Sequence, residues 1–326
     1  MSLHWKILTQ LADGNLHSGQ KMAAQFGVTR SAIWKALKKL EEFDLLVDHQ
    51  RGVGYRLLAG PLDLLTTDEI LSDCGSITAA KLGGLHLLRE IPSTNQYLLD
   101  NRIRDAGAPM ACFAEYQSAG RGRRGRSWHS PLGTNLYSSL AWPVRAAATD
   151  LAGLSLAVGV TVADVLSGLG VQRIGLKWPN DLLVDGQKLG GILIDLRGEA
   201  NGVIWVVIGI GINVNMQSVA DRVIDQPWIS CLQLLGEPLS RNRLAGRLIE
   251  QLITAMEIFE KEGFSAFSQR WSSRDLLVGE SIWVDMGGKK VTAVAKGVDA
   301  TGALLVEYEG STLALHSGEV TVRVAD

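Results

Sequence analysis

Residues 120–128 form a glycine- and arginine-rich segment that constrains this chain more than any other. The segment reads Gly-Arg-Gly-Arg-Arg-Gly-Arg-Ser-Trp and places four arginines within six positions. Glycine allows positive φ and close backbone approach, and arginine presents a fixed fork of donors to carboxylate or phosphate oxygens. Apolar segments flank it at residues 111–114 and 136–140, which favours a loop within a globular domain over a disordered nucleic-acid-binding tail or a solvated basic surface. We therefore predict a flexible loop that closes over a multiply charged anion.

The composition is that of a folded protein in a reducing compartment. The 326 residues are 46% hydrophobic and 20% charged, and the chain is long enough for two or three domains. The net charge is −2, yet residues 1–60 hold eight Lys/Arg against five Asp/Glu, so nucleic-acid contact is expected only there. Cys74, Cys112 and Cys231 suit neither a disulfide framework nor a zinc site. With no signal-peptide pattern and no apolar run of about 18 residues, we expect a cytoplasmic protein without membrane contact.

Residues 1–62 predict a winged helix-turn-helix domain. Ser18 is placed to cap a helix that ends at Phe26 before Gly27, and a second helix begins at Thr29 or Arg30. Strands near residues 45–48 and 54–58 would form the wing. The side chains expected to face DNA are Arg30, Ser31, Trp34, Lys35, Lys38, Lys39 and Arg51. A small helical protein-interaction module is the alternative, but the basic second helix favours DNA, whose phosphates would provide most of the affinity.

Residues 63–272 alternate strands and helices, and residues 273–326 change to short strands with tight turns. In the central part we expect strands at 110–116, 136–142, 190–196 and 203–212 and helices at 151–169 and 243–262. Asp185-Gly186 predicts a two-residue hairpin turn. The apolar stretch 203–212 is expected to be buried on both faces or to lie at a subunit contact. Five short strands near the C-terminus predict a small barrel, so the fold class is α+β with three domains.

Several familiar catalytic motifs are missing from the sequence. There is no P-loop, G-x-S-x-G or H-E-x-x-H motif, and Val214 stands where a dinucleotide fingerprint beginning at Gly209 needs its third glycine. Nothing indicates a covalent nucleophile or a metal held by the protein. Four polar elements remain, at residues 93–95, 120–128, 177–191 and 209–215. Taken singly, the first could be only a helix cap, and Lys188 in the third only a surface lysine beside a turn. Together they predict nucleotide chemistry by positioning and charge stabilisation, in which a substrate carboxylate attacks the α-phosphate of ATP.

The order of these elements resembles that of the biotin protein ligases. The resemblance rests on Ser93-Thr94-Asn95, Gln117, residues 120–126, Lys177-Trp178-Pro179-Asn180-Asp181, residues 188–192 and residues 209–213. It covers essentially the whole chain, and the combined order is specific although each motif alone is weak. The N-terminal helix-turn-helix resembles that of the bifunctional members, which also repress the biotin operon. The resemblance implies a winged helix-turn-helix, a central mixed-sheet ligase domain and a C-terminal SH3-like β-barrel.

The resemblance also implies a role for each matching residue. Biotin would be bound by Ser93, Thr94, Asn95, Gln117, Arg121, Gly122, Arg123 and Lys188. ATP and the adenylate would be bound by Arg121, Arg123, Arg124, Arg126, Asn180, Asn213, Trp228 and Arg323. The catalytic residues would be Lys188, Arg123 and Asp181. Mg²⁺ would arrive with ATP, and Asp181 is its candidate ligand.

By the same resemblance, the protein is expected to form biotinoyl-5′-AMP and to transfer biotin to a lysine of the biotin carboxyl carrier protein of acetyl-CoA carboxylase. The adenylate would act as corepressor, and the adenylate-bound homodimer would repress the biotin biosynthesis operon by binding its operator DNA. The strand at residues 203–210 is the expected dimer edge. Two alternatives stay open: a repressor that senses biotin without catalysis, and a lipoate ligase with a related fold.

Overall fold

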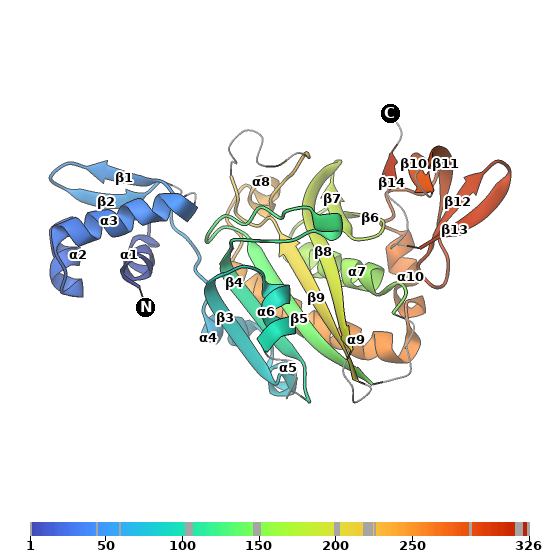
Figure 1. Cartoon of the computed structure of the whole chain (residues 1–326), viewed down its shortest axis with the longest axis horizontal. Helices are drawn as coiled ribbons and strands as arrows, with labels where there is room; N and C mark the ends of the chain where they lie inside the picture. The colour runs from blue at the N-terminus through green and yellow to red at the C-terminus, as the bar shows by residue number, and fades with distance from the viewer. Residues whose placement is uncertain are drawn as a thin grey trace.

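The computed structural model shows an α+β chain whose N-terminal, central and C-terminal parts follow one another along its long axis (Figure 1). The structure describes residues 2–43, 45–58, 60–101, 107–145, 151–198, 203–217, 224, 226–286, 289–316 and 322–324. Within those ranges, no helix combines the length and the apolar character needed to cross a membrane.

The N-terminal part is the predicted winged helix-turn-helix. Ser18 caps the second helix, Gly27 ends it with a φ of 66°, and Thr29 caps the third. The wing is a single antiparallel pair of strands. The elements are α1 (Leu3–Leu11), α2 (Gly19–Phe26), α3 (Arg30–Leu40), η1 (Glu41–Phe43), β1 (Val47–Gln50) and β2 (Gly54–Leu57). These caps satisfy helix-end N–H and C=O groups locally, which is why the sequence pattern predicted them.

The central part is built on a seven-stranded mixed sheet with the order β3-β4-β5-β9-β8-β7-β6. Only β3 and β4 are parallel. Asp185 and Gly186 have φ values of 50° and 76° in the β7–β8 hairpin, which confirms the predicted turn. The strands are β3 (Gly84–Ile91), β4 (Met110–Gln117), β5 (Leu136–Arg145), β6 (Gly175–Lys177), β7 (Asp181–Val184), β8 (Gln187–Gly198) and β9 (Val203–Ile212).

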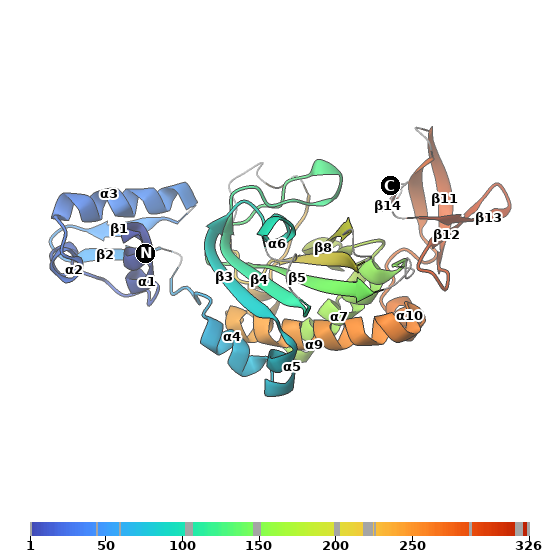
Figure 2. The ribbon, with the colours of Figure 1, turned by 60° about the horizontal axis from the view of Figure 1, so that its bottom comes forward.

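Helices cover both faces of this sheet. The long helices α7 and α9 pack beneath it, and α6 lies on the opposite face beside the glycine–arginine loop (Figure 2). The main apolar core fills the space between the sheet and the long helices. The helices are α4 (Thr67–Asp73), α5 (Ser76–Lys81), α6 (Thr94–Asn101), α7 (Leu154–Gly168), α8 (Cys231–Leu235), α9 (Arg241–Glu262) and α10 (Ser265–Ser272).

The expectation that residues 203–210 form a dimer edge is wrong. Strand β9 pairs with β5 along one side and with β8 along the other, so its backbone groups are already used. Val206, Val207 and Ile208 are fully buried, as the apolar run predicted. A strand that is apolar on both faces gains most from a central position, because both faces are then covered.

The C-terminal part is a five-stranded antiparallel sheet with the order β13-β12-β11-β10-β14. Its strands are β10 (Ser281–Met286), β11 (Lys289–Val298), β12 (Leu304–Tyr308), β13 (Ser311–Leu315) and β14 (Val322–Val324). No ladder between described residues joins β13 to β14, so closure into a barrel stays a prediction, as do the domain boundaries at 62/63 and 272/273. The Gly287-Gly288 pair, a sequence pattern typical of a hairpin turn, lies outside the described residues. Trp178 Nε1 donates to the Gly302 carbonyl at 3.0 Å and ties this sheet to the central part.

The winged helix-turn-helix packs directly against the central part. Phe43 makes an edge-to-face contact with Tyr116 at a centroid distance of 5.0 Å, and the Arg89 guanidinium lies 5.2 Å from the Trp5 ring. Leu132 belongs to the apolar core of the N-terminal part. These contacts bring the base of the glycine–arginine loop next to the DNA-binding domain.

Candidate functional site

One cavity of about 950 Å³ opens on the sheet face that carries α6. It is lined by nearly every residue for which the sequence predicted a ligand-binding role: Ser93, Thr94, Asn95, Gln117, Arg121, Gly122, Arg123, Arg124, Arg126, Asn180, Asp181, Lys188, Asn213 and Trp228. The exception is Arg323, which belongs to β14 and whose side chain lies outside the described part of the structure. Their individual roles stay predictions, but the fold brings the side chains together from seven separate segments.

One end of the cavity is lined mainly by amides and hydroxyls. It is built where β3 ends and α6 begins, and Ser93 Oγ accepts a hydrogen bond from the Gln96 N–H at 3.5 Å. The Thr94 N–H donates to Gln117 Oε1 at 2.9 Å, and the Thr94 hydroxyl lies 3.2 Å from the same oxygen. Ser93, Thr94 and Asn95 are all buried. Amides and hydroxyls at a helix start suit a neutral, polar ring system better than a charged group.

The sequence reasoning missed the residues that hold this polar end in place. Ser139 Oγ lies 2.5 Å from Asn95 Oδ1 and 2.7 Å from Thr94 Oγ1, and Ser139 is buried in β5. Asn95 Nδ2 donates to Asp195 at 2.8 Å. Strand β9 can approach Asn95 only because residue 209 is glycine, since a Cβ there would overlap the Asn95 amide. The alternating pattern of β5 and β8 placed these side chains on one face, but nothing in the local sequence marked that face as the site.

The glycine–arginine loop forms a small closed turn over the cavity. The Gly122 N–H donates to the Arg126 carbonyl at 2.7 Å, and the Trp128 N–H donates to the Gly120 carbonyl at 2.8 Å. Arg124 has a φ of 56° and Gly125 a φ of 72°, which places two successive residues in the left-handed region. Arg121 Nη2 donates to Gln96 Oε1 at 3.1 Å. The loop is therefore a defined turn that carries four guanidinium groups.

Positive charge is concentrated at the other end of the cavity. Burial and the neighbouring Arg124 lower the pKa of Arg123, and the Asp181 carboxylate opposes that shift. Arginine nevertheless stays protonated in proteins, so the crowded cations create a strong site for an anion. Lys188 Nζ and Asp181 Oδ1 form an ion pair at 2.8 Å. This arrangement fits a phosphate chain better than a single carboxylate.

Asn213 and Trp228 lie in the segments that close this charged end. Asn213 Nδ2 donates to the carbonyls of Lys188 at 3.1 Å and Ile229 at 3.2 Å. Lys188 and Trp228 form a parallel bridge, in which the Lys188 N–H donates to Pro227 and the Ile229 N–H donates to Lys188. The amide of Asn213 is thus used to hold backbone, and the sequence did not indicate that use. Trp228 is half-buried beside Lys188.

Trp128 also lines the cavity, although the sequence assigned it no role. A Cβ at residue 211 would come within 2.6 Å of its ring, and one at residue 191 within 3.3 Å. Lys188 Nζ lies 5.6 Å from the ring centroid. Because residues 191 and 211 are glycine, the Trp128 ring of the loop can pack directly on the sheet. The flat group that approaches these two glycines is thus a side chain of the protein itself.

The predicted DNA-binding residues occupy an exposed face of the N-terminal part. Arg30, Ser31, Trp34, Lys35, Lys38 and Lys39 are exposed along α3, and Arg51 is exposed in the wing turn. Trp34 is 55% exposed, which is unusual for a tryptophan, and Lys38 Nζ lies 5.6 Å from its ring. An exposed basic helix beside a basic wing is the arrangement expected of a DNA-reading surface.

The fold and the cavity together define a winged helix-turn-helix protein whose central part suits a ligand with a polar ring and a phosphate chain. Models of known families match three successive stretches of the chain. The HTH domain matches residues 5–56, the Biotin/lipoate A/B protein ligase family residues 87–213, and the Biotin protein ligase C terminal domain residues 278–323.

Similar proteins agree with these matches. Among curated relatives, the bifunctional ligase/repressor BirA of Salmonella typhimurium is 41% identical over 320 residues, covering 98% of this chain and 97% of that one. The protein of the same name from Escherichia coli is 40% identical over 321 residues. A solved structure of the biotin protein ligase from Aquifex aeolicus in complex with biotin and ATP has a TM-score of 0.64 and 26% identity, covering 74% of this chain and all of that one. The chain belongs to the biotin protein ligase family, and its resemblance to the bifunctional ligase/repressors runs along almost its whole length.

Proposed function

We propose that the protein is an ATP-dependent biotin protein ligase and a transcriptional repressor controlled by its own reaction intermediate. The observation that carries the proposal is one cavity that is lined by amides and hydroxyls at one end and by the arginines with the Lys188–Asp181 ion pair at the other. Biotin combines an uncharged ureido ring with a carboxylate, and ATP supplies the phosphates. A cavity with these two ends can bring the carboxylate and the α-phosphate together.

In the first step, a biotin carboxylate oxygen attacks the α-phosphorus of ATP. The bond from that phosphorus to the bridging oxygen of pyrophosphate breaks, which leaves biotinoyl-5′-AMP and pyrophosphate. Ser93, Thr94, Asn95 and Gln117 hold the ureido ring. Lys188 and Arg123 stabilise the negative charge that builds up around the α-phosphate. In the second step, the ε-amine of a carrier lysine attacks the acyl carbon, AMP departs and the amine loses a proton, so that an amide forms.

The remaining residues serve the nucleotide. Arg121, Arg124 and Arg126 close over the phosphates as the loop orders, and Trp228 stacks on the adenine. Arg323 reaches ATP from the C-terminal sheet. Asn180 and Asp181 offer the oxygen donors that Mg²⁺ prefers, so they would hold the Mg²⁺ that accompanies ATP, whose role is to neutralise phosphate charge.

The repressor activity uses the exposed face of α3 and the wing. The adenylate-bound form binds operator DNA as a homodimer, and the partner in the ligase reaction is the biotin carboxyl carrier protein. We place dimerisation at the outer half of β8, one of the open edges of the described sheet, since β7 pairs only with its residues 187–191. Among the described residues, 193–198 have no strand partner on that side. The buried, unpaired cysteines fit a cytoplasmic location.

The test is biotin-dependent exchange of pyrophosphate into ATP, followed by mass spectrometry of the protein with biotin and ATP. We expect exchange and a bound biotinoyl-5′-AMP. Binding of biotin without exchange would leave only a ligand-sensing repressor. Exchange with lipoate and none with biotin would show a lipoate ligase instead.

A further inference from the structure

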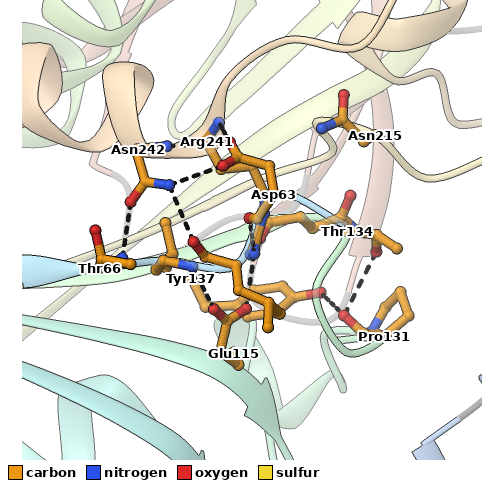
Figure 3. Close-up of polar contacts among 12 residues, drawn as sticks. Asp63, Thr66, Glu115, Pro131, Thr134, Tyr137, Asn215, Arg241 and Asn242 are labelled. Carbon is orange, nitrogen blue, oxygen red and sulfur yellow. Dashed lines mark hydrogen bonds and ion pairs between the residues drawn. The ribbon is translucent and has the colours of Figure 1, made fainter. Parts of the chain in front are cut away.

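A buried polar network fastens the segment between the DNA-binding and central parts onto the start of α9 (Figure 3). The Asp63 carboxylate accepts the Arg241 N–H at 2.5 Å and the Asn242 side-chain amide at 2.8 Å. The Arg241 side chain is fully buried and donates to the Asp63 carbonyl at 2.9 Å and to Glu115 Oε2 at 2.7 Å. Glu115 Oε1 accepts the Leu65 N–H at 2.5 Å. The segment 63–65 is thus held by three hydrogen-bonded residues rather than crossing the surface loosely.

The same network continues from Arg241 to the cavity. Arg241 Nη1 donates to the Asn135 carbonyl at 3.0 Å, and Asn135 Oδ1 accepts the Val214 N–H at 2.9 Å. Val214 follows Asn213, whose amide holds the backbone of Lys188 and of Ile229. Arg241 and Asn135 are fully buried and Asn213 is 5% exposed. Hydrogen bonds, together with the peptide link between Asn213 and Val214, therefore connect Asp63 to the backbone of Lys188.

Because the Arg241 guanidinium is fully buried, the network is sensitive to the loss of any one of its acceptors. The Arg241 guanidinium carries only N–H donors and has no access to water, so every acceptor it loses costs free energy that water cannot restore. Its position is therefore set by Asp63, Glu115 and Asn135 together. The Asp63 carboxylate holds the Arg241 N–H and the Asn242 side chain, while the Asp63 carbonyl accepts from the guanidinium. Removing the carboxylate therefore frees both the start of α9 and the segment that presents this carbonyl, so the guanidinium shifts and the Asn135 carbonyl that it holds moves with it.

The polar end of the cavity has separate supports. Asn95 is held by Ser139 and Asp195, and Thr94 by Gln117. None of these contacts passes through Asp63 or Arg241. A disturbance that enters at Asp63 therefore reaches the charged end of the cavity first.

We propose that Asp63 is a positioning residue for the nucleotide half of the site, acting through Arg241, Asn135 and Asn213. The segment that carries the DNA-binding domain is then a structural part of the ATP site. This inference rests on the proposed function for the identity of the two ligands. The path itself rests on the hydrogen bonds alone.

The experiment compares full-length Asp63→Ala with the wild type in two assays. We expect the KM for ATP in pyrophosphate exchange to rise roughly 10- to 100-fold, the range that displacement of a positioned group produces. The Kd for biotin, measured by direct titration without ATP, stays within about twofold, because its supports are intact. Rates are divided by the concentration of active sites, so that loss of folded protein does not imitate a change in KM.

A matched control separates positioning from stability. Asp164 pairs with Arg270 at 2.9 Å and Arg274 at 2.7 Å, away from the cavity lining. Asp164→Asn should lower the melting temperature and leave both KM for ATP and Kd for biotin at the wild-type values. An Asp63→Ala protein that behaves in the same way, or that loses biotin affinity as much as ATP affinity, would overturn the inference.

A second variant and a second measurement keep the test decisive if Asp63→Ala does not fold. Asp63→Asn keeps one acceptor oxygen and removes the charge, so a smaller rise in KM for ATP is expected. Hydrogen exchange at the Val214 amide should speed up in Asp63→Asn and stay unchanged in Asp164→Asn. Unchanged KM and unchanged exchange would refute the path. Changed exchange at Val214 in Asp63→Asn, together with a wild-type protein that does not bind biotin, would instead refute the proposed function and keep the path.

Discussion

At the scale of single residues, Lys188 is held by several contacts at the charged end of the cavity. Its ammonium group forms a 2.8 Å ion pair with Asp181 and lies over the Trp128 ring, and its carbonyl is held by Asn213. A cation held in place at the point where charge develops can stabilise a transition state more than a ground state.

Lys188→Ala should therefore slow adenylate formation roughly 100- to 1000-fold, the range seen when one such donor is removed. Biotin affinity should change far less, because we assign the binding of the ring to Ser93, Thr94 and Gln117. Single-turnover pyrophosphate release and biotin titration measure the two quantities. Equal losses in both would make Lys188 a binding residue only.

The cysteines give a second prediction at this scale. Burial raises the pKa of Cys74 to about 11 and the pKa values of Cys112 and Cys231 to about 12. Since only the thiolate is nucleophilic, iodoacetamide at neutral pH should leave all three unmodified in the folded protein and modify all three in denaturant. Mass spectrometry gives the count, and labelling of the native protein faster than unfolding would show that a thiol is accessible.

At the scale of elements, the site depends on the close packing of the glycine–arginine loop against strand β9. Strand β9 accepts the Trp128 ring because residue 211 has no Cβ, and a Cβ there would lie 2.6 Å from the ring. Glycine is used here for close approach and not for an unusual φ, since Gly211 is absent from the positive-φ glycines of the described residues.

Gly211→Ala should displace Trp128 and with it the loop that carries the arginines. We expect biotin and ATP affinity to fall about tenfold or more, in line with small displacements of positioned groups. Gly198→Ala is the matched control, because β8 offers open space at that position. Intrinsic tryptophan fluorescence and equilibrium titration test both variants. If the Gly211→Ala protein binds both ligands normally, the loop does not depend on the contact between Trp128 and Gly211.

At the scale of the whole molecule, the surfaces that we propose for DNA binding and for ligation are separate. The basic face of α3 is exposed, whereas the cavity lies in the central part. Their physical connection runs through the Phe43–Tyr116 contact and the Asp63 network. Changes confined to the exposed face of α3 should therefore affect one activity only.

The double variant Lys35→Glu and Lys38→Glu should lose operator binding and keep biotin ligation. If each lysine contacts a phosphate, the slope of log affinity against log salt should fall by about one for each. Lys261→Glu, an exposed lysine at the end of α9, is the control for charge alone. Filter binding across a salt series and a carrier-biotinylation assay provide the readouts, and retained operator affinity would place the DNA surface elsewhere.

Local chemistry made much of this protein predictable from its sequence. Ser18, Gly27 and Thr29 fix their helix ends through groups at most three or four residues away, and Asp185-Gly186 sets its hairpin in the same way. The apolar run of β9 similarly predicted burial on both faces. The arginines, Lys188 and the residues 93–95 were recognisable because their order along the chain matches a family, and the structure gathers them in one cavity.

Long-range packing decided the strand order and the distant contacts, which local sequence patterns could not predict. Whether β9 lies at an edge or in the middle depends on which strands pair with it, and the apolar pattern is the same in either case. Trp128 reaches Gly211 across 83 positions, and Arg241 reaches Asp63 across 178. Such contacts arise from the free energy of burying the whole core and of pairing each buried polar group, which no short window of sequence contains. The residues of the glycine–arginine loop were enough to predict a loop that binds an anion. The tertiary fold decided that its tryptophan packs on β9 and that its base lies beside the DNA-binding domain.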